Sequence, residues 1–120
     1  MQVKLAKTFR FEAAHRVQQL PSQHPCHEMH GHGYRVVIEI SGEVDETTGF
    51  LLDYGDVKKA VAPIIEKLDH SCLNDIEDLK FTTSEYLCRW LWDRIKPELP
   101  LLSKITIYET DTTSCEYSEQ

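Results

Sequence analysis

Apolar and polar residues alternate over the first part of the chain, which is typical of a β-strand with one buried face. In the segment Val3–Glu12 the apolar residues share one parity, and the other parity is mostly charged or polar. A second alternating segment runs from Tyr34 to Ser41 and ends at Gly42. Prolines at both ends of residues 21–25 prevent regular structure between the two segments. The two strands could therefore pair antiparallel around this polar loop.

Two helices are predicted next, because apolar residues recur at helical spacing on one face of each segment. The first begins after Gly55, and Pro63 inside it predicts a kink or a local break. The second begins at Thr82-Thr83-Ser84-Glu85, which has the T-x-x-E pattern of a capping box, and ends at Lys96-Pro97.

The end of the chain predicts two more strands joined by a Thr/Asp/Ser turn. One contains Ile105 and Ile107, and the other contains Cys115 and Tyr117. The order ββααββ indicates an α+β domain, with two helices on one face of a four-stranded antiparallel sheet.

Size and charge limit the possible functions. The chain has 120 residues, with 13 Lys and Arg against 20 Asp and Glu, and a formal net charge of −7. We expect residues 1–120 to form a single domain that is too small to enclose a large active-site cavity. The acidic balance argues against nucleic acid or an anionic membrane as a partner, because both are bound through excess Lys and Arg.

The pattern of apolar residues and cysteines indicates a cytoplasmic protein. The N-terminus lacks the apolar core of a signal peptide, and no apolar run is long enough for a membrane span. Four cysteines are scattered along the chain: Cys26, Cys72, Cys88 and Cys115. We expect reduced thiols. Cys88 fits a small buried residue of the second helix, whereas Cys72 and Cys115 have no assigned role.

Histidine is concentrated in one stretch, since five of the six histidines lie between residues 15 and 32. His30 and His32 share one face of the second strand because they are two residues apart, and His15 ends the neighbouring strand. Three neutral imidazoles with an open position are typical of a catalytic zinc site. A coincidental H-x-H would be the better interpretation for His30 and His32 alone, but His15 and the histidine density favour the metal. His24 and His27 remain unassigned.

Two further features are typical of proton transfer. Cys26 lies four residues before His30, and a thiol near a cation can serve as a base or a nucleophile. Its alternative, a small buried residue, fits a Pro/His-rich loop poorly. Asp69-His70 follows the first helix, and a carboxylate beside a histidine can orient the ring. A helix-end histidine favoured by the helix dipole is an equally good interpretation of His70.

One carboxylate falls on the buried side of a predicted strand. Glu109 shares parity with Ile105 and Ile107, so its side chain points toward the apolar side. Buried carboxylates need partners. A ligand that offers two N–H donors would supply them, and the alternative is an edge position where the strand frays into solvent.

Six short motifs occur in order along the chain. They are Phe11-Glu12-Ala13-Ala14-His15-Arg16, Cys26-x-x-x-His30-Gly31-His32, Leu68-Asp69-His70, Leu73-Asn74-Asp75, Thr83-Ser84-Glu85 and Tyr108-Glu109-Thr110. Together they resemble the 6-pyruvoyl-tetrahydropterin synthase superfamily over nearly the whole chain. The three residues between Cys26 and His30 look most like the bacterial 6-carboxy-5,6,7,8-tetrahydropterin synthases of queuosine biosynthesis, because the animal pyruvoyl-forming enzymes have a longer stretch there.

The resemblance implies a tunnelling fold (T-fold), in which ββααββ subunits join their sheets into a barrel, commonly as a homo-hexamer of two trimers. It implies that Zn²⁺ is the cofactor, bound by His15, His30 and His32. It also implies a catalytic triad of Cys26, Asp69 and His70, with the last two reaching in from a neighbouring subunit.

The resemblance also implies a substrate-binding set. Glu109 would bind the amino group and the ring N–H of a pterin, helped by Thr83, Ser84 or Glu85. The substrate would be a polyanion, so Lys and Arg must gather at the mouth of the site against the acidic average of the chain. Arg16 is a candidate phosphate contact because it adjoins His15.

The implied reaction converts 7,8-dihydroneopterin triphosphate to 6-carboxy-5,6,7,8-tetrahydropterin, with release of acetaldehyde and triphosphate. The nearest alternative is an enzyme of the same fold that makes the pyruvoyl product or trims a related pterin side chain. A third hypothesis, from another class, is a non-catalytic module in which zinc serves only assembly.

Overall fold

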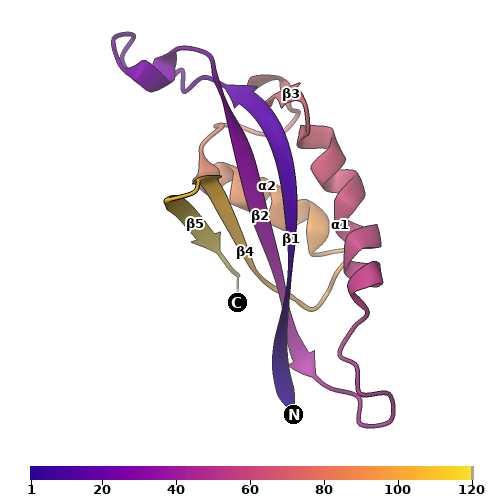
Figure 1. Cartoon of the computed structure of the whole chain (residues 1–120). Coiled ribbons are helices and arrows are strands. Elements are labelled where there is room, and N and C mark those ends of the chain that lie inside the picture. The colour runs from indigo at the N-terminus through magenta and orange to yellow at the C-terminus, as the bar shows by residue number, and fades with distance from the viewer. Residues whose placement is uncertain (120) are drawn as a thin grey trace.

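Two long paired strands are the main element of the computed structural model, which describes residues 1–119 (Figure 1). Strand β1 (Gln2–His15) pairs antiparallel with β2 (His30–Glu43), in a register that runs from Gln2 opposite Glu43 to His15 opposite His30. Both strands extend beyond the alternating segments of the sequence. The predicted pairing around the histidine-rich loop is confirmed. Gln120, the last residue of the predicted domain, lies outside the described residues.

Within residues 1–119 the sheet has five strands in the order β3-β1-β2-β4-β5, so the prediction of four was wrong on this point. Strand β4 (Leu102–Thr110) pairs antiparallel with β2, and β5 (Thr113–Tyr117) pairs antiparallel with β4. The additional strand, β3 (Ser71–Cys72), pairs parallel with β1. A two-residue strand is too short to show alternation, which is why the pattern of the sequence did not predict it.

Two helices, α1 (Tyr54–Leu68) and α2 (Ser84–Ile95), cover one face of the sheet, as predicted (Figure 1). Their apolar faces and the inward parity of the strands form one core, in which Val61, Leu91 and Ile107 are fully buried. Helix α1 continues through Pro63, so the predicted break does not occur. Pro63 is exposed, and the carbonyl that loses its helical hydrogen bond there can bind water instead.

The start of α2 differs from the predicted capping box by one residue. Thr83 is the N-cap, and its hydroxyl accepts a hydrogen bond from the Tyr86 N–H at 3.5 Å. Thr82, the expected capping residue, directs its carbonyl and hydroxyl toward His15 instead. The predicted end of the helix is confirmed, because Lys96 is the C-cap.

The connections contain two single-turn helices, η1 (Pro25–His27) and η2 (Leu73–Asp75). The four cysteines are free thiols, as expected, and Cys88 is fully buried in the core. Within residues 1–119, no helix combines the length and the hydropathy that a membrane crossing requires.

Candidate metal and active site

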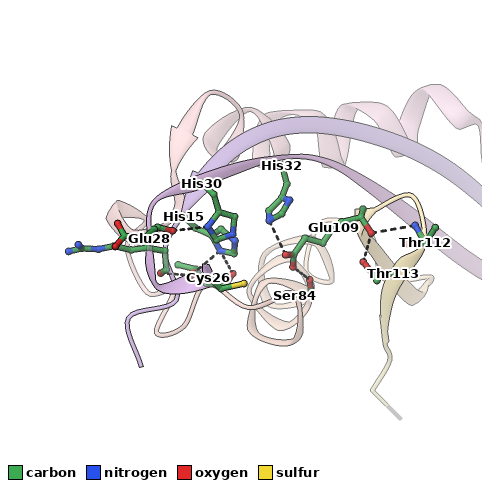
Figure 2. A network of polar contacts seen from close by, with 12 residues as sticks. His15, Cys26, Glu28, His30, His32, Ser84, Glu109, Thr112 and Thr113 are labelled. Carbon is green, nitrogen blue, oxygen red and sulfur yellow. Dashed lines mark hydrogen bonds and ion pairs between the residues drawn. The ribbon is translucent and has the colours of Figure 1, made fainter. Parts of the chain in front are cut away.

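Three histidine rings meet at one end of the β1–β2 ribbon, beside the loop that joins the two strands (Figure 2). His15 and His30 face one another across the ladder, and His32 lies on the same face as His30 because the side-chain period of a strand is two. The ring centroids of His15 and His30 are 4.6 Å apart, and His32 lies 4.9 Å from His30 and 5.3 Å from His15. The structure thus brings together the three histidines that their spacing singled out.

Carbonyl groups outside the cluster determine which nitrogen of the His15 and His30 rings faces inward. The Nδ1 atom of His15 lies 3.0 Å from the Thr82 carbonyl oxygen and 3.1 Å from the Thr82 hydroxyl. The Nδ1 atom of His30 lies 2.8 Å from the Glu28 carbonyl oxygen. A carbonyl only accepts, so each Nδ1 donates its proton and each Nε2 presents a lone pair. Metal-ligating histidines are typically held in this way.

Two of the inward-facing nitrogens are buried without a hydrogen bond. Among residues 1–119, His15 Nε2 and His32 Nε2 have no hydrogen bond. His15 is only 1% exposed, and burial lowers the pKa of its imidazole, which favours the neutral ring that a metal requires. An unpaired buried polar atom usually has a functional reason. Neutral imidazole nitrogens directed at one point fit a divalent metal such as zinc.

Glu109 reaches the same cluster from β4. Its Oε1 lies 3.0 Å from His32 Nε2, without the alignment of a hydrogen bond, and its Oε2 accepts a hydrogen bond from the Ser84 hydroxyl at 3.0 Å. The ligating atoms of Glu109 and the three histidines all lie within 4.8 Å of one another, so a single cation could contact the four groups. The prediction from strand parity that the Glu109 side chain points inward is confirmed, although 29% of this side chain is exposed.

The candidate substrate-binding residues lie in different places. Ser84, Glu85 and Glu109 line one cavity of about 330 Å³. The Thr83 hydroxyl caps α2 by accepting a hydrogen bond from the Tyr86 N–H. Arg16 lines a different cavity, together with Lys80 and Thr82.

Cys26 lies in η1, beside the cluster, as a half-buried free thiol. Figure 2 shows its side chain beside the rings of His15 and His30, with the sulfur directed to the side of the site on which Ser84 and Glu109 are drawn. The start of the loop is hydrogen-bonded to the Cys26 residue, because the Val17 N–H donates to the Cys26 carbonyl at 2.8 Å. A thiol is thus held next to the histidine cluster.

Asp69 and His70 pair with one another on the outer edge of β1. Asp69 Oδ2 lies 3.1 Å from His70 Nδ1, and Asp69 Oδ1 accepts a hydrogen bond from the Glu12 N–H at 2.9 Å. This N–H is the main reason why the pKa of Asp69 is below its ordinary value, and the His70 ring adds to the effect. The His70 N–H donates in turn to the Glu12 carbonyl at 2.6 Å. Neither residue belongs to the group of ligating atoms around His15, and 78% of the His70 side chain is exposed.

Several contributions to the site were not predicted from the sequence. Thr82 and Glu28 orient the rings of His15 and His30 through backbone carbonyls, which any residue type carries, and the Thr82 hydroxyl adds a contact to a residue distant in sequence. His24 contacts the backbone of the Cys26 loop. Tyr34 lies beneath the cluster with its ring centroid 5.6 Å from that of His32, and burial raises the pKa of its hydroxyl.

Comparison with known proteins gives concordant results. The family model described as 6-pyruvoyl tetrahydropterin synthase matches residues 4–120. The chain is 31% identical to human 6-pyruvoyl tetrahydrobiopterin synthase over 133 residues, which covers 97% of this chain and 91% of that protein. It is 32% identical over 118 residues to the 6-carboxy-5,6,7,8-tetrahydropterin synthase of Synechocystis, which covers 92% of this chain and 89% of that protein.

Structural comparison leads to the same group of proteins. The structure of 6-pyruvoyl tetrahydropterin synthase from Caenorhabditis elegans matches with a TM-score of 0.92 at 27% identity, covering 100% of this chain and 97% of that one. The α+β T-fold implied by the motifs is confirmed, with one strand more than predicted. The chain belongs to the 6-pyruvoyl tetrahydropterin synthase family.

Proposed function

We propose that this protein is a zinc-dependent lyase of queuosine (7-deazaguanine) biosynthesis, which converts 7,8-dihydroneopterin triphosphate and water to 6-carboxy-5,6,7,8-tetrahydropterin, acetaldehyde and triphosphate. The observation that carries the proposal is the convergence of three histidines and the Glu109 carboxylate at one end of the sheet, with the Cys26 side chain beside them in Figure 2. The human relative named for the pyruvoyl product and the Synechocystis relative named for the carboxy product have nearly the same identity to the chain, 31% and 32%. The choice between them rests on the three-residue spacing from Cys26 to His30.

In this proposal His15, His30 and His32 hold the zinc through their Nε2 atoms. When bound, zinc supplies Lewis-acid chemistry, which acidifies the side-chain hydroxyls of the substrate. The Thr82 and Glu28 carbonyls keep the rings of His15 and His30 in the ligating tautomer.

Glu109 binds the pterin rather than the metal. Its carboxylate can accept from both the amino group and the ring N–H of a pterin, which matches two donors with two acceptor oxygens. The Ser84 hydroxyl orients one of these oxygens, and Glu85 lines the same cavity. Thr83 contributes indirectly, because it caps the helix that carries Ser84.

Proton transfer is assigned to three residues. Cys26, as the thiolate, removes a proton from the substrate side chain beside the ring, and His70, oriented by Asp69, handles the second proton transfer. The exposure of His70, which does not belong to the group of ligating atoms around His15, supports a site completed by a neighbouring subunit. We therefore include a homo-hexamer of two trimers, each subunit a single T-fold domain, in the proposal. Arg16 meets the triphosphate at the mouth of the site.

We also propose that the reaction takes place in the cytoplasm, where a free thiol such as that of Cys26 stays reduced. The test is incubation of the zinc-loaded protein with 7,8-dihydroneopterin triphosphate and measurement of acetaldehyde and triphosphate. Equal amounts of both products are expected.

The second candidate function, formation of the pyruvoyl product, is favoured by the similarity to the human protein. Triphosphate without acetaldehyde would support it and overturn the carboxy assignment. If neither product forms, and zinc removal dissociates the oligomer, the zinc serves assembly and the protein is not a lyase.

A further inference from the structure

The loop between β1 and β2 contains a histidine to which the proposed function gives no role. His24 is exposed and is the N-cap of η1, with extended backbone angles of φ −73° and ψ 135°. Its ring Nδ1 accepts a hydrogen bond from the backbone N–H of Cys26 at 3.0 Å. The side chain of His24 therefore contacts the residue that carries the thiol.

This contact gives a partner to a backbone N–H group that has none inside η1. The first N–H groups of a helix have no partner inside it, and a capping side chain commonly accepts from one of them. In η1 the first residue is Pro25, which has no N–H, so Cys26 offers the first free donor. Serine, threonine, aspartate and asparagine are the usual capping residues, and here a histidine ring takes their place.

The Cys26 peptide is thus held on both sides. The Val17 N–H binds its carbonyl at 2.8 Å, and the His24 ring binds its N–H. The backbone N–H of His27 also donates to the His24 carbonyl at 3.0 Å, which closes the turn around the cysteine. With both polar groups of the cysteine backbone bound, the direction of its Cα–Cβ bond is fixed, and the side chain stays beside the histidine cluster (Figure 2).

We propose that His24 is a positioning residue for Cys26: its ring, as a hydrogen-bond acceptor, closes the η1 turn and holds the thiol beside the histidine cluster. The inference rests on the proposed function, in which the Cys26 thiolate is the base. His24 itself does not contact the substrate, so its effect falls on turnover and on the reactivity of the thiol.

The experiment compares the wild type with three variants: His24→Ala, which removes the acceptor, His24→Asn, which keeps a neutral capping acceptor, and Gln23→Ala, a control at the preceding exposed residue. For each we would measure bound zinc, kcat and KM with dihydroneopterin triphosphate, and the rate of Cys26 alkylation by iodoacetamide, followed on its peptide by mass spectrometry. Loss of a cap typically shifts a local equilibrium by about fivefold.

We expect His24→Ala to lower kcat about fivefold and to speed Cys26 alkylation about fivefold, with KM and zinc unchanged. His24→Asn should restore both values, and Gln23→Ala should match the wild type. Wild-type values in His24→Ala, or a failure of Asn to restore them, would overturn the proposal. If the wild type itself shows no turnover, the proposed function fails, and the alkylation rates alone decide the role of His24.

Discussion

Replacement of Glu109 by glutamine tests whether its carboxylate binds the pterin or the metal. Both roles are geometrically possible, because Glu109 lies within reach of a cation held by the histidines and also lines a cavity beside them. Glutamine has nearly the same shape and can still accept from the Ser84 hydroxyl through its carbonyl oxygen. It loses the negative charge and one acceptor, and it turns an NH₂ group toward a pterin donor.

The two roles predict different sizes of effect. A hydrogen bond to a charged group contributes about 1.5–3 kcal/mol, so the loss of one such bond to the pterin weakens binding about 10-fold to 150-fold. Zinc affinity should change less than about tenfold, because the three imidazoles remain and their orienting carbonyls are untouched. A lost metal ligand would instead release the zinc.

The assay measures zinc affinity by chelator competition and pterin affinity by calorimetry with neopterin, a pterin without the triphosphate. Glu116→Gln is the matched control, because Glu116 lies on β5 with 62% of its side chain exposed and does not line the Glu109 cavity. Zinc loss in Glu109→Gln, with pterin binding reduced only in proportion to that loss, would refute our reasoning and make Glu109 a fourth ligand.

Three further predictions concern the base, the edge of the sheet and the core. Cys26→Ala should keep its zinc but lose turnover, and unchanged turnover would exclude the thiol as the base. Asp69 has a lowered pKa in the folded state, so its stabilising effect is present at neutral pH and is lost as pH falls through that lowered value, below the unfolded pKa of about 3.9. The free energy of unfolding that Asp69→Asn loses relative to the wild type, measured in urea, should therefore be smaller at pH 2.5 than at pH 7. An equal loss at both pH values would contradict the pairing of Asp69. Leu91→Ala, in the fully buried core, should cost about 3 kcal/mol in urea unfolding, and the exposed Leu101→Ala should cost less than about 0.5 kcal/mol.

Strand periodicity explains why so much of the site could be predicted. Side chains alternate strictly along a strand, so the parity of His30, His32 and Glu109 determined the face on which each one lies. His15 was correctly placed next to them because the two long strands are consecutive and pair directly through one loop. The alternation of side chains along a strand was sufficient to predict the site wherever the strands were long.

The remaining features depend on contacts between distant parts of the chain. Thr82 was predicted to cap α2, but it contacts His15, which is 67 residues away in sequence. Strand β3 exists because Ser71 and Cys72 follow the turn at His70, whose N–H binds the edge of β1. Neither contact leaves a pattern in the local sequence, since a threonine hydroxyl and a backbone N–H can each find many partners.

Zinc content and turnover, measured together in the wild type and in His30→Ala, test the central claim most directly. We predict one zinc per chain and release of triphosphate from 7,8-dihydroneopterin triphosphate in the wild type, and neither in His30→Ala. His27→Ala, which removes a loop histidine outside the cluster, should keep the zinc. A His30→Ala protein that holds no metal and turns over at the wild-type rate would contradict the account.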